Sequence, residues 1–238
     1  HLSHFLLAHT ISENVKSSQI VRAYLKKEIH TQEETEELND WMERLLNLIS
    51  SCSDLILMNE DGTVYYSYSG CQAVNDKRRM EVYENAASNL VGDGTWTEKG
   101  SSLCQKNAEE VVTFISSINK VILAIELNPE TFGLLMLNNY STFQNQYTYL
   151  VDCAGNVLCS NKTNIYDWGD VVTKGMEKGV RRYEFNWDNK DYFACRQYNG
   201  LTGWETYSVV STDDFFPQAK TKSQRKSKTE YPHCQKSL

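Results

Sequence analysis

The chain has 238 residues, of which 40% are hydrophobic, and its formal net charge at neutral pH is −7. This hydrophobic content excludes a wholly disordered chain, and the length allows one or two domains of about 150 residues. No apolar run approaches the roughly 20 residues of a membrane-spanning helix. The sequence begins at His1 without a signal-peptide pattern, so we expect a soluble fragment of a longer protein.

Charge is unevenly distributed along the chain. From Pro217 onward, six lysines and arginines face one acidic residue, Glu230, which leaves a net charge of about −12 on residues 1–216. An acidic body repels phosphate backbones, so this composition argues against nucleic-acid binding by the folded part. We interpret residues 217–238 as a solvated terminus rather than as a binding arm, because no apolar pattern is interleaved with the charge.

The first fifty residues have a helical pattern. Apolar residues recur at spacings of three and four from Leu7 onward, which predicts one long helix over residues 2–29. Such a helix would be about 40 Å long at 1.5 Å per residue, and this length suggests a stalk that packs along the rest of the chain. Thr31 and Glu34 form a capping-box pattern, which predicts the start of a second helix.

Two later segments share a hairpin pattern. Leu57–Ser67 and Leu150–Ser160 each contain an apolar strand, an Asn or Asp, two residues, a Gly and an alternating strand. The glycine supplies the positive φ of a tight turn, and the Asn or Asp can hydrogen-bond the turn backbone. We therefore predict a hairpin in each segment.

A second pair of segments repeats in the same order. Ala124–Phe132 and Tyr207–Phe215 each join a strand to a helix start, with Asn128 or Ser211 as the predicted N-cap. One such match could be a coincidence between two common hairpins. Two matches in the same order favour an internal duplication.

Each half also has the pattern of a helix followed by antiparallel strands. The predicted ranges are Asp76–Leu90, Val111–Ile118 and Lys120–Leu127 in the first half, and Asp170–Glu177, Val180–Trp187, Asp191–Tyr198 and Trp204–Val210 in the second. These elements predict an α+β fold in which a long N-terminal helix precedes two PAS-like antiparallel-sheet domains. The predicted units are a helical stalk (1–50), two PAS-like domains (51–140 and 141–216) and a basic tail (217–238).

The order of these motifs resembles the double-Cache domain. The resemblance is carried by Asp61-Gly62, Val121–Phe132, Tyr149–Ser160 and Thr202–Phe215. Double-Cache domains are the ectodomains of bacterial sensor histidine kinases, chemoreceptors and membrane diguanylate cyclases. The resemblance implies that residues 51–140 are a membrane-distal, ligand-binding domain and that residues 141–216 are membrane-proximal.

The same resemblance implies a function. We expect the extracellular ligand-sensing domain of a bacterial transmembrane receptor at the cell membrane, first of all a two-component sensor histidine kinase, with a diguanylate cyclase or a chemoreceptor as the alternative. The implied partners are an unknown small-molecule ligand and a second copy in a parallel homodimer, with membrane helices flanking this fragment. A protein-interaction module that reuses the fold without sensing is a further alternative.

The expected ligand pocket lies between the first sheet and its covering helix. Its candidate residues are Glu126, Tyr66, Tyr83, Trp96 and Thr113. Glu126 takes the position of an Asp in amino-acid-binding relatives, and a buried carboxylate on a strand needs a partner, which a cationic ligand would supply. The Arg-x-Trp-Tyr motif of those relatives is absent, and with it the usual partner of a ligand carboxylate. The alternatives are that the aromatics are core residues and that Glu126 faces solvent.

No pattern indicates catalysis, a metal or a cofactor. Gly-x-Ser-x-Gly is absent, and the seven cysteines have neither Cys-x-x-Cys nor zinc-ribbon spacing. We therefore expect no enzymatic activity in this fragment. The first predicted hairpin would bring Cys52 and Cys71 near each other at its open end.

Overall fold

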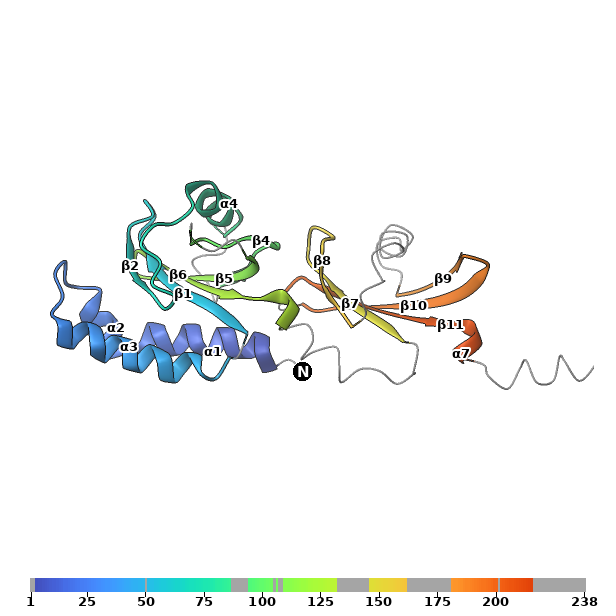
Figure 1. Cartoon of the computed structure of the whole chain (residues 1–238), viewed down its shortest axis with the longest axis horizontal. Coiled ribbons are helices and arrows are strands. Elements are labelled where there is room, and N and C mark those ends of the chain that lie inside the picture. Colours follow the sequence, from blue (N-terminus) through green and yellow to red (C-terminus); the bar gives the residue numbers. More distant parts are fainter. Residues whose placement is uncertain are drawn as a thin grey trace, which may run out of the picture.

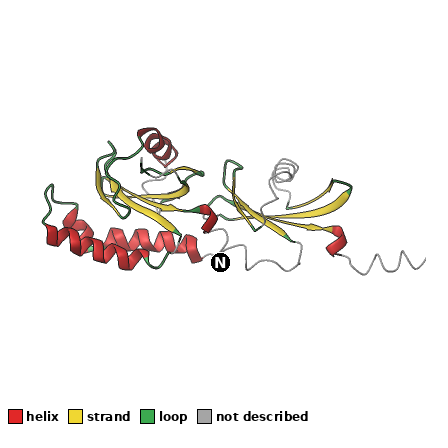
Figure 2. Cartoon of the chain, in the orientation of Figure 1, coloured by secondary structure: helices red, strands yellow, loops and turns green. Residues whose placement is uncertain are grey.

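The computed structural model describes residues 3–49, 51–86, 94–104, 106, 109–131, 146–161, 181–200 and 202–215. Two antiparallel sheets follow each other along the long axis of the molecule (Figure 1). Three N-terminal helices cover one face of the first sheet, and a fourth helix covers the other face (Figure 2). The predicted α+β class is confirmed.

The N-terminal helices are α1 (Ser3–Ser17), α2 (Gln19–Tyr24) and α3 (Gln32–Leu46). The predicted single helix over residues 2–29 is wrong. Ser18 adopts an extended backbone, and its hydroxyl accepts a hydrogen bond from the Val21 amide at 3.4 Å. A serine that caps a new helix in this way ends the preceding one.

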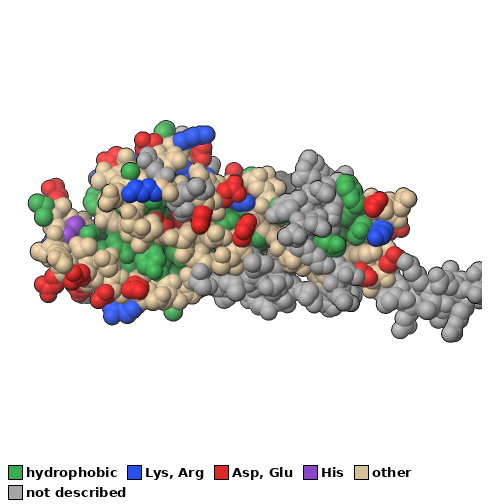
Figure 3. All heavy atoms as spheres, in the orientation of Figure 1, with side chains coloured by type: hydrophobic (Ala, Val, Ile, Leu, Met, Phe, Trp, Pro, Cys, Tyr) green, Lys and Arg blue, Asp and Glu red, His purple; other side chains and the backbone are tan. Residues whose placement is uncertain are grey.

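Helix α3 begins as predicted. Thr31 and Glu34 form the reciprocal capping box. The helix buries Leu38, Met42 and Leu46 against the first sheet and leaves most of its acidic residues exposed. These acidic side chains gather along the lower edge of the molecule near its N-terminal helices (Figure 3).

The first sheet has six strands among the described residues, in the order β2-β1-β6-β5-β3, with β4 also paired to β5. Its strands are β1 (Cys52–Met58), β2 (Val64–Ser67), β3 (Thr95–Trp96), β4 (Gly100–Ser101), β5 (Glu110–Ile118) and β6 (Val121–Leu127). The covering helix α4 runs over Asp76–Ala86. Its predicted extension to residue 90 lies outside the described residues.

The second sheet has five strands within the described ranges, in the order β8-β7-β11-β10-β9. Its strands are β7 (Tyr147–Val151), β8 (Val157–Ser160), β9 (Arg182–Trp187), β10 (Lys190–Tyr198) and β11 (Glu205–Ser211), followed by helix α7 (Thr212–Phe215). The predicted helix Asp170–Glu177 and the basic tail lie outside the described residues.

The two sheets repeat one connectivity. β2-β1-β6-β5 corresponds to β8-β7-β11-β10 in both pairing and chain order. The turns match in detail, because Gly62 (φ 93°) donates to the Asn59 carbonyl and Gly155 (φ 91°) donates to the Asp152 carbonyl. Each hairpin also has a bulge just after its turn. The predicted hairpins are therefore confirmed.

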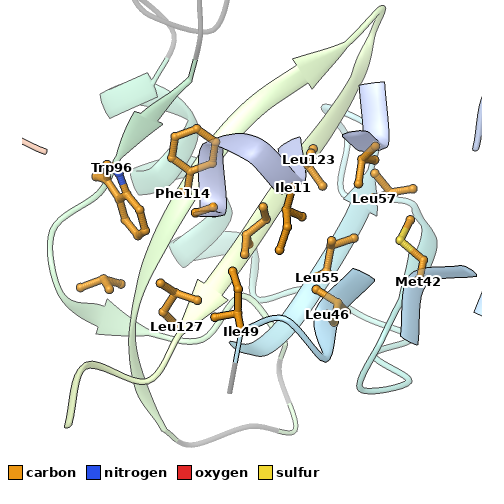
Figure 4. Close-up of a cluster of buried hydrophobic side chains, with 14 of the residues drawn as sticks. Ile11, Met42, Leu46, Ile49, Leu55, Leu57, Trp96, Phe114, Leu123 and Leu127 are labelled. Carbon is orange, nitrogen blue, oxygen red and sulfur yellow. The ribbon is translucent and has the colours of Figure 1, made fainter. Parts of the chain in front are cut away.

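The main core lies between the first sheet and the N-terminal helices. Ile11, Met42 and Leu46 from the helices meet Leu55 and Leu57 from β1 (Figure 4). Burial of such side chains stabilises the fold by about 1.5–3 kcal/mol each.

The same core continues into the second sheet. Trp204, which is 1% exposed, packs edge-on against Trp96 with ring centroids 5.1 Å apart. Close by in the sequence, the Lys99 amide donates to the Asp152 carboxylate at 3.1 Å. Among the described residues, the two sheets are thus joined by a shared core, which also includes Leu150, Leu158 and Cys159, and by a hydrogen bond from a backbone amide to a carboxylate.

Candidate functional site

The candidate site is the face of the first sheet that α4 covers. Glu126 on β6 lies opposite Asp54 on β1 and Thr113 on β5, and all three side chains are fully buried. On the same face of β6, Ile122 and Ala124 pack in a cluster that includes Val82 of α4. Strand alternation therefore places two carboxylates and a hydroxyl together on an otherwise apolar surface.

Both oxygens of Glu126 are held by protein groups. The Ser102 hydroxyl and the Leu103 amide each donate to the carboxylate at 2.6 Å. Burial nevertheless raises the pKa of Glu126 to about 7, assisted by Asp54 and opposed by these hydrogen bonds and by Arg78. The loop before β5 therefore supplies protein partners to Glu126, and a cationic ligand as a further partner stays a prediction.

Asp54 is a second buried carboxylate, which sequence reasoning missed. It accepts hydrogen bonds from the Ser67 hydroxyl at 2.9 Å, the Ser69 amide at 3.0 Å and the Ser69 hydroxyl at 2.6 Å. The signal was an acidic residue inside an apolar strand pattern. Asp54 ties the end of β2 and the following loop to the centre of the sheet.

Arg78 is the other missed residue. It lies on α4 and is 6% exposed. Its guanidinium donates to the Glu98 carbonyl at 2.9 Å and approaches Glu81 at 3.4 Å, whereas its Nε finds no acceptor among the described residues. Its spacing of four from the buried Val82 could have indicated an inward position. The sequence lacks Arg-x-Trp-Tyr, but the fold still places a buried arginine near Glu126.

The five predicted pocket residues do not lie together. Thr113 shares the face of Glu126, and its buried hydroxyl has no partner among the described residues. Tyr83 packs half-buried on the same side. Tyr66 and Trp96 instead belong to the core under the N-terminal helices, so they cannot line a pocket that contains Glu126.

An open groove lies elsewhere on the first sheet. It has a volume of about 830 Å³ and lies between the N-terminal helices and the β5–β6 turn. Its walls include Lys16, Arg22, Lys26 and Lys120 but none of the predicted pocket residues.

Several solved structures have a fold similar to that of this chain. The ligand-binding domain of the Pseudomonas aeruginosa amino acid chemoreceptor PctB, with L-Arg, is 18% identical at a TM-score of 0.60, over 97% of this chain and 90% of that one. The domain of Pseudomonas fluorescens CtaA, with L-isoleucine, is 14% identical (TM-score 0.58; 90% and 86%). That of Campylobacter jejuni Tlp3, with 4-methylisoleucine, is 11% identical (TM-score 0.52; 89% and 88%).

The chain has the fold of a bacterial chemoreceptor ligand-binding domain. This confirms the Cache-type resemblance at the level of the fold. No family model matches the sequence, and no curated protein matches it. Within the described part of the chain, no helix combines the length and apolar character of a membrane span.

Glu126 should make the stability of the domain depend on pH. Its folded-state pKa, about 7, lies above the ordinary value of 4.5, so its protonated form favours folding below pH 4.5. That contribution is lost as the pH rises through 7, by at most about 3 kcal/mol. The glutamine in Glu126→Gln does not titrate, so the variant should gain stability relative to the wild type between pH 4.5 and 8.

Urea unfolding at several pH values measures this difference. The exposed Glu37 of α3 provides the matched control, and Glu37→Gln should follow the wild-type curve. Parallel curves for the wild type and Glu126→Gln would contradict the assignment.

Proposed function

We propose that the chain is the extracellular ligand-sensing domain of a bacterial transmembrane receptor and that its ligand binds on the α4 face of the first sheet. The main support is the buried Arg78, which lies on the same side of the sheet as Glu126 and whose Nε has no hydrogen-bond acceptor among the described residues. Buried polar groups without partners are costly. The Nε of Arg78 and the hydroxyl of Thr113, which have no partner among the described residues, are therefore available to a ligand.

The arrangement favours a small zwitterion as the ligand. Arginine binds carboxylates through paired donors, so Arg78 is the proposed partner of the ligand's acid group. A cationic amine near Glu126 would favour the ionised form of a carboxyl group that now titrates near neutrality. The residues Ser102 and Leu103 would have to yield part of their hold on Glu126. The similar domains named above carry amino acids, which have both groups.

The output of the receptor is a separate proposal. The sequence suggested a sensor histidine kinase first, whereas the similar solved domains belong to chemoreceptors, which supports that alternative. A full-length sequence with its cytoplasmic domain decides between them. We also propose that the complete receptor forms a parallel dimer through its N-terminal helices.

A thermal-shift screen of amino acids, amines, organic acids and sugars tests the ligand proposal. At 100 times its dissociation constant, a ligand stabilises the folded state by about 2.7 kcal/mol, which corresponds to a rise in Tm of about 8 °C for a domain of this size. We expect amino acids among the hits. Arg78→Gln should abolish the shift, and Glu126→Gln should reduce it.

Lys77, which is exposed on the same helix, provides the control. Lys77→Gln should keep the full shift. The Tm of each variant without ligand shows whether it folds, and Arg78→Lys is the fallback if Arg78→Gln does not. Hits that survive both site substitutions undiminished would place the ligand elsewhere.

A further inference from the structure

Two buried cysteines lie beside the candidate site on different loops. Cys71 follows β2 and Cys104 lies in the loop before β5, and each is 5% exposed. An isolated antiparallel bridge pairs Val74 with Cys104, and the next residue, Asn75, donates its amide to the Leu103 carbonyl at 2.7 Å. In this pairing Cys104 lies opposite Val74, which follows Cys71 by three residues on the same loop. The two loops are therefore held in register.

After burial, the Cys104 thiol is the next cause that raises the pKa of the Cys71 thiol, which places the two thiols near each other. Both are free in the structure. The predicted hairpin suggested Cys52 as the neighbour of Cys71, but the thiol that affects the pKa of Cys71 is that of Cys104. Two buried thiols near each other on paired loops suit a disulfide, which forms when the two Cα atoms come within roughly 4.4–6.8 Å of each other.

The backbone amide of each cysteine donates a hydrogen bond to a serine that in turn binds a buried carboxylate. The Cys71 amide donates to the Ser67 hydroxyl at 2.9 Å, and Ser67 donates to Asp54. The Cys104 amide donates to the Ser102 hydroxyl at 3.0 Å, and Ser102 donates to Glu126. A bond between these cysteines would therefore join the two loops that satisfy both carboxylates of the site.

We propose that Cys71 and Cys104 form a disulfide when the chain folds in an oxidising environment, and that this bond clamps the two loops over Asp54 and Glu126. The oxidant is a low-molecular-weight or protein disulfide. One cysteine thiolate attacks it, forms a mixed disulfide and releases one thiol. The second thiolate attacks the mixed disulfide, closes the Cys71–Cys104 bond and releases a second thiol. The oxidant is reduced to two thiols, which take up the two protons lost by the cysteines.

The folded protein should react slowly. Burial, together with the neighbouring Cys104 thiol, raises the pKa of Cys71 to about 12. Because only thiolates attack disulfides, few molecules are reactive at neutral pH once the site has formed. The bond is therefore expected to close during folding.

Refolding the full chain in a mixture of reduced and oxidised glutathione tests the pairing. Remaining thiols are alkylated under denaturing conditions, and the protein is digested without reductant by trypsin and a glutamate-specific protease. Cleavage at Glu60 separates Cys52 from Cys71, and Lys99 and Lys106 bracket Cys104. Mass spectrometry should find the Cys71 peptide joined to the Cys104 peptide. Full alkylation of both, or either one joined to another cysteine, overturns the proposal.

Thermal unfolding tests the clamp. The refolded wild type should melt about 10 °C higher than the same sample after reduction, because the bond constrains the unfolded chain. Cys71→Ser should lose most of this redox-dependent difference, whereas Cys195→Ser, at a half-buried position on β10, should retain it. An equal difference in Cys71→Ser would show that another bond produces it. The wild-type comparison needs no variant, so it holds even if Cys71→Ser folds poorly.

Discussion

Trp204→Ala should lower the free energy of unfolding by about 4 kcal/mol, one of the two largest effects expected for this chain. Trp204 is 1% exposed and contributes to the core that the first sheet shares with the N-terminal helices. Truncation removes the edge-on contact with Trp96 and leaves a cavity where the two sheets meet. Equilibrium unfolding in urea measures the loss.

The control for this substitution is Trp187→Ala. Trp187 lies on β9 and is 36% exposed, so its removal should cost about 1 kcal/mol or less. Comparable losses in the two variants would contradict the central position of Trp204. A Trp204→Ala unfolding curve with two transitions would instead show that the sheets had become independent units.

Asp54→Ala should destabilise the chain by a similar amount, about 4 kcal/mol. The substitution removes the acceptor of three hydrogen bonds from Ser67 and Ser69, and it leaves those donors partly buried without a partner. The loop after β2 should then become accessible to water. Urea unfolding reports the global loss, and hydrogen exchange at Ser69 and Cys71 reports the local opening.

Asp40→Ala on the exposed face of α3 provides the comparison. It should change the stability by less than about 0.5 kcal/mol. Unchanged exchange at Ser69 in Asp54→Ala would show that the loop does not depend on the carboxylate.

The fold was largely predictable because its local signals are strong. The capping box at Thr31, the two glycine turns and the helix cap at Asn128 each have a mechanism that acts within a few residues. The prediction of one long N-terminal helix was wrong because a local signal was overlooked. An apolar stripe continued through Ser18, and the sequence did not reveal that its side chain would cap a new helix rather than extend the old one.

The site was less predictable, because its composition depends on which face each residue occupies. Glu126 and Thr113 share one face of the sheet, as the predicted pocket requires, since both lie on long regular strands. Tyr66 and Trp96 lie on the other face, because the register of short strands against their neighbours is set by tertiary packing. Arg78 and Asp54 were missed because burial of a charge is rare for either residue type. The burial of these two charges can be recognised only from the folded structure, in which Glu98 is the partner of Arg78, and Ser67 and Ser69 are the partners of Asp54.

The loop between β3 and β4 connects Arg78 of the candidate site to the second sheet. Thr97 and Glu98 touch the guanidinium of Arg78, and the next residue, Lys99, binds Asp152 in the turn of the second sheet. Three residues span at most about 10 Å of extended chain. A ligand that displaced Arg78 would therefore also displace part of the second sheet, because only a short backbone segment lies between them. The conformational change would then be a small displacement of one backbone segment, and neither sheet would have to deform.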